Sequence, residues 1–154
     1  MSYFIRDAGR KLFEADITNL ENVIGIALPR AYRDFLLNHN GGRPTPKIFR
    51  IPQTKSFGQV LDFFAIDDPV ESCCIDWNVG VFSARMPSGL IPIACEDGGN
   101  IICIGVDTQK IGRIYYWDHD NETSAAGYQN VFKIAESLDE FLENLLDLDE
   151  SSMR

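Results

Sequence analysis

The chain has 154 residues, of which 45% are hydrophobic and 24% charged, and its formal net charge at pH 7 is -9. This length predicts a single domain over residues 1–154, and the composition is ordinary for a soluble globular protein. The acidic excess argues against nucleic acid as a direct ligand, because phosphate binding requires clustered Lys and Arg. It is compatible with a basic partner or with solubility alone.

The expected location is the cytoplasm. No apolar run approaches the length of a membrane span, so we expect no contact with a membrane. Residues 1–16 are charged throughout and lack the apolar core of a secretory signal.

The four cysteines are Cys73, Cys74, Cys95 and Cys103, and they form no C-x-x-C pair. Adjacent cysteines cannot easily bind one tetrahedral metal ion together. Cys95 and Cys103 lie in apolar stretches, where a reduced thiol behaves as a small hydrophobic group. We therefore expect core cysteines and no metal site. A cysteine nucleophile is conceivable, but nothing in the sequence marks these two thiols as exposed.

The N-terminal part predicts two short helices that pack as a corner. Residues 1–17 fit a loose helix or an extended arm. Thr18–Glu21 has the capping-box pattern of a helix start, and Gly25 weakens the end of that helix. The expected buried face of this helix consists of Leu20, Val23, Ile24 and Ala27. Pro29 predicts the first position of a second helix, which Asn40–Gly42 ends. Its apolar stripe consists of Ala31, Tyr32, Phe35 and Leu36.

The middle of the chain alternates extended and turn signals. Pro44–Pro52 is rich in proline and predicts a short strand at a sheet edge. Lys55–Gly58 predicts a loop and Gln59–Ile66 a strand. Asp67-Asp68-Pro69 is typical of a helix start, with acids near the positive end of the dipole. A short, imperfect helix is then expected over Glu71–Asn78.

A β-meander is the central prediction. Its strands are expected at Leu90–Cys95, Asn100–Val106 and Arg113–Asp118, joined by turns at Glu96–Gly99 and Asp107–Gly112. The second strand is apolar at four successive positions, which is typical of a strand with both faces covered.

The C-terminal part adds one strand and one helix. Asp120–Gln129 is expected as a polar loop and Val131–Ile134 as a short strand. Ser137–Glu140 is a second capping box. The helix it opens has an apolar stripe of Leu138, Phe141, Leu142, Leu145 and Leu146. The order of elements predicts an α+β fold: an N-terminal helical corner, a central, mostly antiparallel sheet with a β-meander, and a C-terminal helix packed on the sheet.

Four stretches together resemble the SUKH superfamily. Leu28–Gly42 (LPRAYRDFLLNHNGG) resembles its Leu-Pro, Tyr, Phe-Leu and Asn-Gly-Gly signature. Ile91–Ile104 (IPIACEDGGNIICI) is similar to its Ile-Pro-Ile-Ala and Gly-Gly-Asn strand pair, and Gly112–Asp120 (GRIYYWDHD) to its Tyr-x-Trp-Asp-His segment. The closing ESLDEFLENLL resembles the family's last helix, although Leu138 stands where an aromatic residue is often found.

The resemblance implies a compact cytoplasmic α+β domain that binds another protein, with no cofactor and no chemistry. The superfamily includes a fungal regulator of cell-wall synthesis and many bacterial proteins that neutralise polymorphic or contact-dependent toxins, often nucleases. The chain lacks the long flanks of fungal members, which favours the immunity role. An endogenous regulatory or adaptor protein of the same fold is the alternative.

Asp118-His119-Asp120 is the most enzyme-like cluster. A histidine between two carboxylates suits a general base or a metal ligand, so a hydrolase using His119 is a third hypothesis. Successive side chains on a strand point to opposite faces, however, so His119 is expected to point away from both neighbours. A strand end whose side chains bond turn amides is the favoured interpretation. We predict no catalytic, cofactor-binding or metal-binding residue.

Loop acids and one aromatic residue form the expected partner-binding set. Its members are Asp67, Asp68, Glu71, Trp77, Glu96, Asp97, Asp118, Asp120 and Glu122. A subset would form a negative patch that meets the nucleic-acid groove of a basic toxin, which raises the association rate and the selectivity. The simpler alternatives are solvated loop acids and an aromatic residue that packs in the core.

Overall fold

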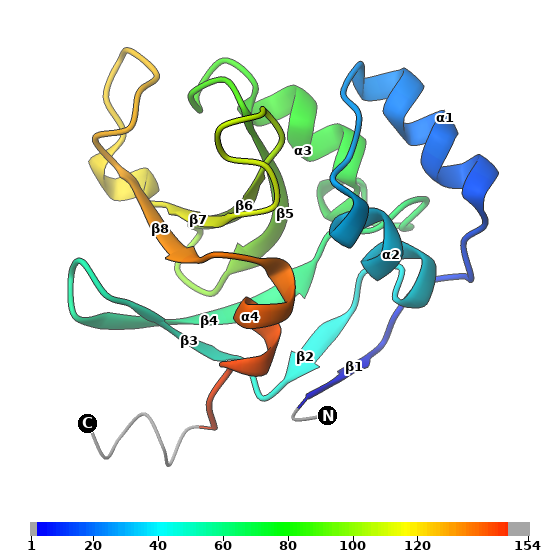
Figure 1. Cartoon of the computed structure of the whole chain (residues 1–154), viewed down its shortest axis with the longest axis horizontal. Helices are drawn as coiled ribbons and strands as arrows, with labels where there is room; N and C mark the ends of the chain where they lie inside the picture. Colours follow the sequence, from blue (N-terminus) through cyan, green and yellow to red (C-terminus); the bar gives the residue numbers. More distant parts are fainter. Residues whose placement is uncertain (1–2, 148–154) are drawn as a thin grey trace.

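The computed structural model describes residues 3–147. Its main sheet is antiparallel throughout, in the order β3-β4-β5-β6-β7-β8 (Figure 1). The strands are β3 (Ile48–Ile51), β4 (Ser56–Phe63), β5 (Leu90–Glu96), β6 (Ile101–Gly105), β7 (Ile114–Trp117) and β8 (Val131–Ala135). The sheet curls until its two edges approach, and the Gln53 side chain donates to the Lys133 carbonyl of β8 at 3.0 Å. The sheet is therefore nearly barrel-like.

The helices lie on one side of this sheet and across the gap between its two approaching edges. They are α1 (Glu14–Ile24), α2 (Arg30–Asn38), η1 (Glu71–Cys73), α3 (Ile75–Phe82), η2 (His119–Asn121) and α4 (Leu138–Glu143). α3 packs on β5 and α1 on α3, while α4 packs on β8 and α2 (Figure 1). A small second sheet pairs β1 (Phe4–Arg6) with β2 (Arg43–Thr45), so residues 4–6 are extended rather than helical. The α+β architecture is confirmed.

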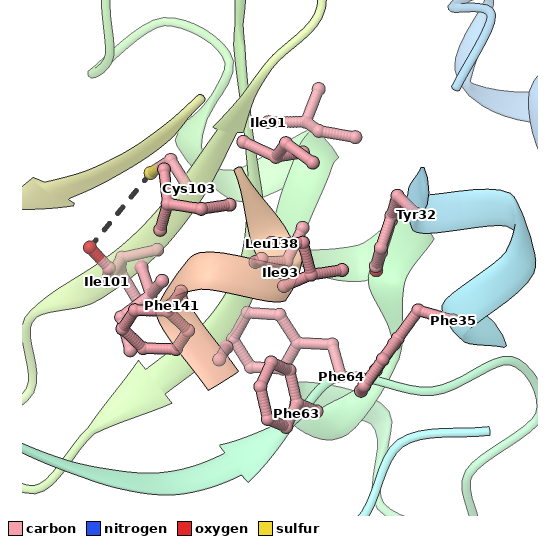
Figure 2. Packing of buried hydrophobic residues seen from close by; sticks show 14 of the residues in the cluster. Tyr32, Phe35, Phe63, Phe64, Ile91, Ile93, Ile101, Cys103, Leu138 and Phe141 are labelled. Carbon is pink, nitrogen blue, oxygen red and sulfur yellow. Dashed lines mark hydrogen bonds between the residues drawn. The ribbon is translucent and has the colours of Figure 1, made fainter. Parts of the chain in front are cut away.

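The β-meander is confirmed in β5, β6 and β7. Every residue of β6 and of β7 is buried, as expected for strands with both faces covered. Aromatic pairs join the helices to the sheet, with ring centroids 4.8 Å apart for Phe35 and Phe63 and 5.6 Å apart for Phe49 and Phe141. Figure 2 shows Tyr32 and Phe35 of α2 directed at the side chains of the sheet and of α4.

The start of α1 differs from the expectation. The helix begins at Glu14, four residues before Thr18, so the capping box proposed for Thr18–Glu21 is wrong and lies within the helix. The cap is made instead by the Asp16 carboxylate, which accepts from the backbone N–H of Phe13 at 2.8 Å. An acid in the first turn also suits the positive end of the helix dipole.

Glu21 has a different task, at the corner between α1 and α2. Its carboxylate accepts from the backbone N–H of Leu28 at 2.7 Å and from the Arg33 guanidinium at 2.5 Å. The helical corner is thereby confirmed, and it is held by hydrogen bonds that the sequence pattern did not predict. Val23 and Ala27 are exposed, contrary to expectation, because the buried face runs through Ile17 and Leu20.

α2 agrees with its apolar pattern except at Ala31, which is exposed. It begins at Arg30 with Pro29 as the N-cap, one residue later than expected. Tyr32, Phe35 and Leu36 are buried as predicted. Boundary differences of one residue carry no structural consequence.

β4 is shifted towards the N-terminus relative to its predicted range. The expected loop Lys55–Gly58 is mostly strand, because β4 starts at Ser56 and its residues 56–59 pair with β3. β4 ends at Phe63 because the chain then leaves the sheet. The backbone N–H of Ala65 donates to the Cys73 carbonyl at 2.9 Å, which pairs this segment with η1.

The segment predicted as one imperfect helix over Glu71–Asn78 divides into η1 and α3. Cys74 between them has extended backbone angles (φ -91°, ψ 140°). α3 then continues to Phe82, beyond the predicted end.

α4 has half of its predicted capping box. The Ser137 hydroxyl accepts from the Glu140 N–H at 3.0 Å, but the Glu140 carboxylate accepts from the Glu136 N–H rather than from that of Ser137. The helix ends at Glu143, before the last two leucines of the stripe. Leu146 pairs instead with Ile48 of β3, through backbone hydrogen bonds of 2.7 and 3.2 Å.

Candidate binding surface

A buried asparagine organises the end of the meander, where the β5–β6 turn meets the segment after β7. Asn100 is 7% exposed. Its amide nitrogen donates to the Tyr116 hydroxyl at 2.6 Å and to the Glu96 carboxylate at 3.0 Å, and its oxygen accepts from the backbone N–H of His119 at 2.8 Å. Burial and the nearby Glu96 carboxylate raise the pKa of Tyr116. Asn100 therefore links three segments.

The His119 side chain adds a further contact to this network. Its Nε2 lies 2.9 Å from the Gly98 carbonyl oxygen, and a Cβ on Gly99 would lie 3.2 Å from that nitrogen. Gly99 has φ 87°, the left-handed region that glycine favours. Nε2 is 3.6 Å from the Asp120 carboxylate, beyond hydrogen-bonding distance. The ring thus packs on the turn instead of lying between two carboxylates.

Asp118 is used locally as a cap. Its carboxylate accepts from the Asp120 N–H at 3.0 Å and from the Asn121 side chain at 2.6 Å at the start of η2. Its own backbone is held by Asn130, which is 1% exposed and exchanges two hydrogen bonds with it, at 2.8 and 2.9 Å. The Asp-His-Asp cluster therefore has the geometry of a strand end whose side chains bond turn groups.

The nine expected partner-binding residues divide into two groups. The meander-end group consists of Glu96, Asp97, Asp118, Asp120 and Glu122. Within it, Glu96 is buried, whereas Asp97 and Asp120 are exposed. Glu122 accepts from the Arg85 guanidinium at 2.8 and 2.9 Å, and this ion pair lowers the pKa of Glu122.

The second group, Asp67, Asp68, Glu71 and Trp77, lies beside η1 and α3, on the side of the molecule that carries α1 (Figure 1). Asp67 accepts from Arg10 at 2.8 Å, and Asp68 accepts from the backbone N–H of Val70 at 2.8 Å. Glu71 is exposed. Trp77 is 36% exposed, so it is not a core residue. The structure therefore brings four of the nine together here and separates them from the meander-end group.

The cysteines occupy two kinds of environment. Cys103 is buried, with its sulfur 3.6 Å from that of Met86, as expected for a core residue. Cys95 is partly buried and packs against the core, whereas Cys73 and Cys74 are partly buried outside it, so the expectation of core thiols is wrong for these two. Burial raises the pKa of Cys73 and Cys74, and that of Cys95 to about 11. These surroundings disfavour the thiolate that a nucleophile requires.

No three side chains of His, Cys, Asp and Glu within residues 3–147 lie close enough together to hold a metal ion. No helix within this range has both the length and the apolar character needed to cross a membrane.

Sequence reasoning missed the buried asparagines. Besides Asn100 and Asn130, Asn40 is 4% exposed, donates to the carbonyls of Arg10 and Ile66, and accepts from the Ile66 N–H. Their place in the sequence could have indicated this role, because Asn40 precedes and Asn100 follows a Gly-Gly pair. The irregular backbone at such a pair leaves polar groups without partners in a helix or sheet.

The domain combines a helical corner, a curled antiparallel sheet and a C-terminal helix, and buried asparagines hold its irregular turns. This combination defines a specific class of α+β domain. The chain belongs to the SMI1 / KNR4 family (SUKH-1), whose family model matches residues 11–144. The superfamily resemblance noted from the sequence motifs is thereby confirmed.

A curated relative has a similar length. Over 166 aligned positions the chain is 29% identical to the SPbeta prophage-derived uncharacterized protein YokK of Bacillus subtilis (strain 168), covering 94% of this chain and 81% of that protein.

Proposed function

We propose that the protein is a cytoplasmic immunity protein that binds a polymorphic or contact-dependent toxin and blocks it by covering its working surface. Family membership is the observation that carries this proposal. It acts by binding and transforms no substrate. No residue or cofactor takes part in chemistry, and the partner is another protein.

The charge of the molecule supports a basic toxin domain, such as a nuclease, as that partner. The formal net charge is -9, and exposed carboxylates occur in both groups of expected binding residues. Opposite charges on two proteins raise their rate of encounter, which suits an inhibitor that must act before the toxin does.

The test is co-purification with the toxin encoded beside this gene, together with protection of cells that produce that toxin. Binding should be tight at low salt and should weaken along a salt series. Binding that does not respond to salt would remove the electrostatic part of the proposal. Absence of both binding and protection would remove the whole.

An endogenous regulator or adaptor of the same fold is the competing proposal. The two differ in genomic setting, since an immunity gene is expected beside a toxin gene. A gene without such a neighbour, whose deletion alters growth in the absence of any toxin, would favour the regulator.

A further inference from the structure

We infer that the solvent-facing side of α3 is the surface by which this protein docks on a basic partner, an inference that rests on the proposed function. The α3 face is defined as Trp77, Gly80 and Val81. These residues recur at i, i+3 and i+4, so they share one side of the helix. All three are exposed, Trp77 by 36% and Val81 by 38%.

α3 is apolar on both of its sides. Ile75 and Val79 are buried on the side that packs on β5. The eight residues of α3 contain one charged residue, Asp76. A helix on the surface of a domain normally turns charged side chains outwards. An outward face that is apolar instead is a mark of an interaction site.

Exposed apolar side chains also occur beside the two elements that contact α3, which are η1 and α1. Val70, directly before η1, is 56% exposed, and Val23 of α1 is 71% exposed. Val23 and Asp76 line the same cleft of about 200 Å³ between α1 and α3. The exposure of Val23, which the sequence pattern places on a buried face, is then explained as part of a surface that is covered in the complex.

The charges around the α3 face favour a basic occupant. Arg10 is already paired with the carboxylates of Asp16 and Asp67, Arg43 with that of Asp62, and Arg85 with that of Glu122. Glu71 and Asp76, in contrast, form no ion pair within residues 3–147. The carboxylates of Glu71 and Asp76 therefore make the surroundings of the α3 face negative, whereas the face itself carries the aromatic Trp77 and no charge. An aromatic centre with few charged residues is typical of a binding hot spot.

The expected occupant presents an apolar pocket ringed by Lys and Arg. A second copy of this chain is disfavoured, because a symmetric contact would bring the same carboxylates together.

Gly80 provides a probe that leaves the free protein intact. No atom lies within 4 Å of a Cβ built at Gly80, so Gly80→Gln fits without a clash and replaces a poor helix former with a better one. The new side chain protrudes from the centre of the α3 face. We expect it to weaken binding of the toxin encoded beside the gene by about tenfold or more. Ala31→Gln, at an exposed helical position of α2, is the matched control and should leave affinity unchanged.

A second pair of variants tests the charges. Glu71→Gln combined with Asp76→Asn removes two carboxylates beside the α3 face, and Asp97→Asn combined with Asp120→Asn removes two at the meander end. Both pairs change the net charge equally. We expect the first pair to slow association with the toxin by about tenfold at low salt, and the second pair to have a much smaller effect.

The outcomes separate this inference from the proposed function. If the wild-type chain binds the toxin and Gly80→Gln binds equally well, the inference is overturned and the proposed function stands. If the wild-type chain neither binds nor protects, both are overturned. Sedimentation of the free protein gives a third result: a dimer that Gly80→Gln dissociates would assign the α3 face to a second copy and overturn the inference.

Discussion

The Nε2 nitrogen of His119 lies 2.9 Å from the carbonyl oxygen of Gly98. This contact joins the Gly-Gly-Asn turn after β5 to the Trp-Asp-His segment after β7, two motifs of the family that are far apart in sequence. A carbonyl oxygen only accepts hydrogen bonds, so Nε2 carries a proton in this contact. The histidine thus has a structural partner in the turn, and the family motifs that share this network have a role in the fold that needs no chemistry.

Replacement of His119 separates the structural role from the hydrolase hypothesis. Its ring makes one hydrogen bond to a backbone carbonyl at the protein surface, so His119→Ala should cost at most about 1 kcal/mol of unfolding free energy in urea. The variant should still bind the toxin and protect cells. Folded protein that has lost protection while keeping its affinity for the toxin would favour the hydrolase.

Asn100 should be far less tolerant than His119. Asn100→Ala removes three hydrogen bonds and leaves the buried Tyr116 hydroxyl and the His119 N–H without their partner. We expect a loss of about 3 kcal/mol in the free energy of unfolding, measured by urea denaturation. Asn22→Ala, at an exposed position of α1, is the control and should change stability by less than about 0.5 kcal/mol. A similar small change for both variants would contradict the account of the network.

Removal of the hydroxyl group should change the free energy of unfolding in opposite directions at Tyr32 and Tyr116. Tyr32 is 1% exposed and its hydroxyl has no hydrogen-bond partner within residues 3–147, whereas the Tyr116 hydroxyl accepts from Asn100 at 2.6 Å. Tyr32→Phe removes an unpaired buried polar group and should raise the free energy of unfolding by about 1 kcal/mol. Tyr116→Phe should lower it by about the same amount. Calorimetry of both variants checks the signs, and destabilisation by Tyr32→Phe would show that its hydroxyl is bonded.

The meander and the apolar stripe of α2 were predictable because their signals are local. Hydrophobic periodicity and glycine-rich turns fix where each strand or helix lies and which side faces the core. The first capping box failed because α1 begins four residues before Thr18, so Asp16 and not Glu21 lies in its first turn. The spacing alone does not say which of them bonds a helix N–H and which bonds the next helix.

The candidate sites were less predictable, because they are formed by tertiary contacts. Asn100 and His119 are brought together only by the pairing of β6 with β7. The exposure of Trp77 on α3 and of Val23 on α1 depends on how these two helices pack on each other and on the sheet. The acidic residues could be named from the sequence, but their division into structural and exposed members could not.

Thiol reactivity should follow the environments of the four cysteines. Cys73 and Cys74 are partly exposed, the pKa of Cys95 is raised to about 11, and Cys103 is buried. At pH 8 a thiol with a pKa of about 11 is thiolate in about one molecule in a thousand. With an aromatic disulfide reagent at pH 8, two thiols should react first, Cys95 slowly and faster as pH rises, and Cys103 only in denaturant. Rapid labelling of Cys95, identified by mass spectrometry, would contradict its raised pKa.

The Arg85–Glu122 pair should give stability that depends on pH with a definite sign. Arg85 lowers the pKa of Glu122, and its guanidinium also lies 5.2 Å from the ring centroid of Trp117. Because the folded pKa lies below the unfolded value of 4.5, the pair stabilises the fold above about pH 4.5 and loses that contribution as pH falls further.

Glu122→Gln should therefore lower the free energy of unfolding by about 0.5–1 kcal/mol at pH 7, the range of partly exposed ion pairs, and the difference from wild type should shrink towards zero at pH 3. Glu71→Gln removes a carboxylate that forms no ion pair within residues 3–147, so it should show little difference at either pH. Urea titrations at the two pH values measure both variants. A Glu122→Gln deficit that persists at pH 3 would mean that the carboxylate contributes through packing rather than through its charge.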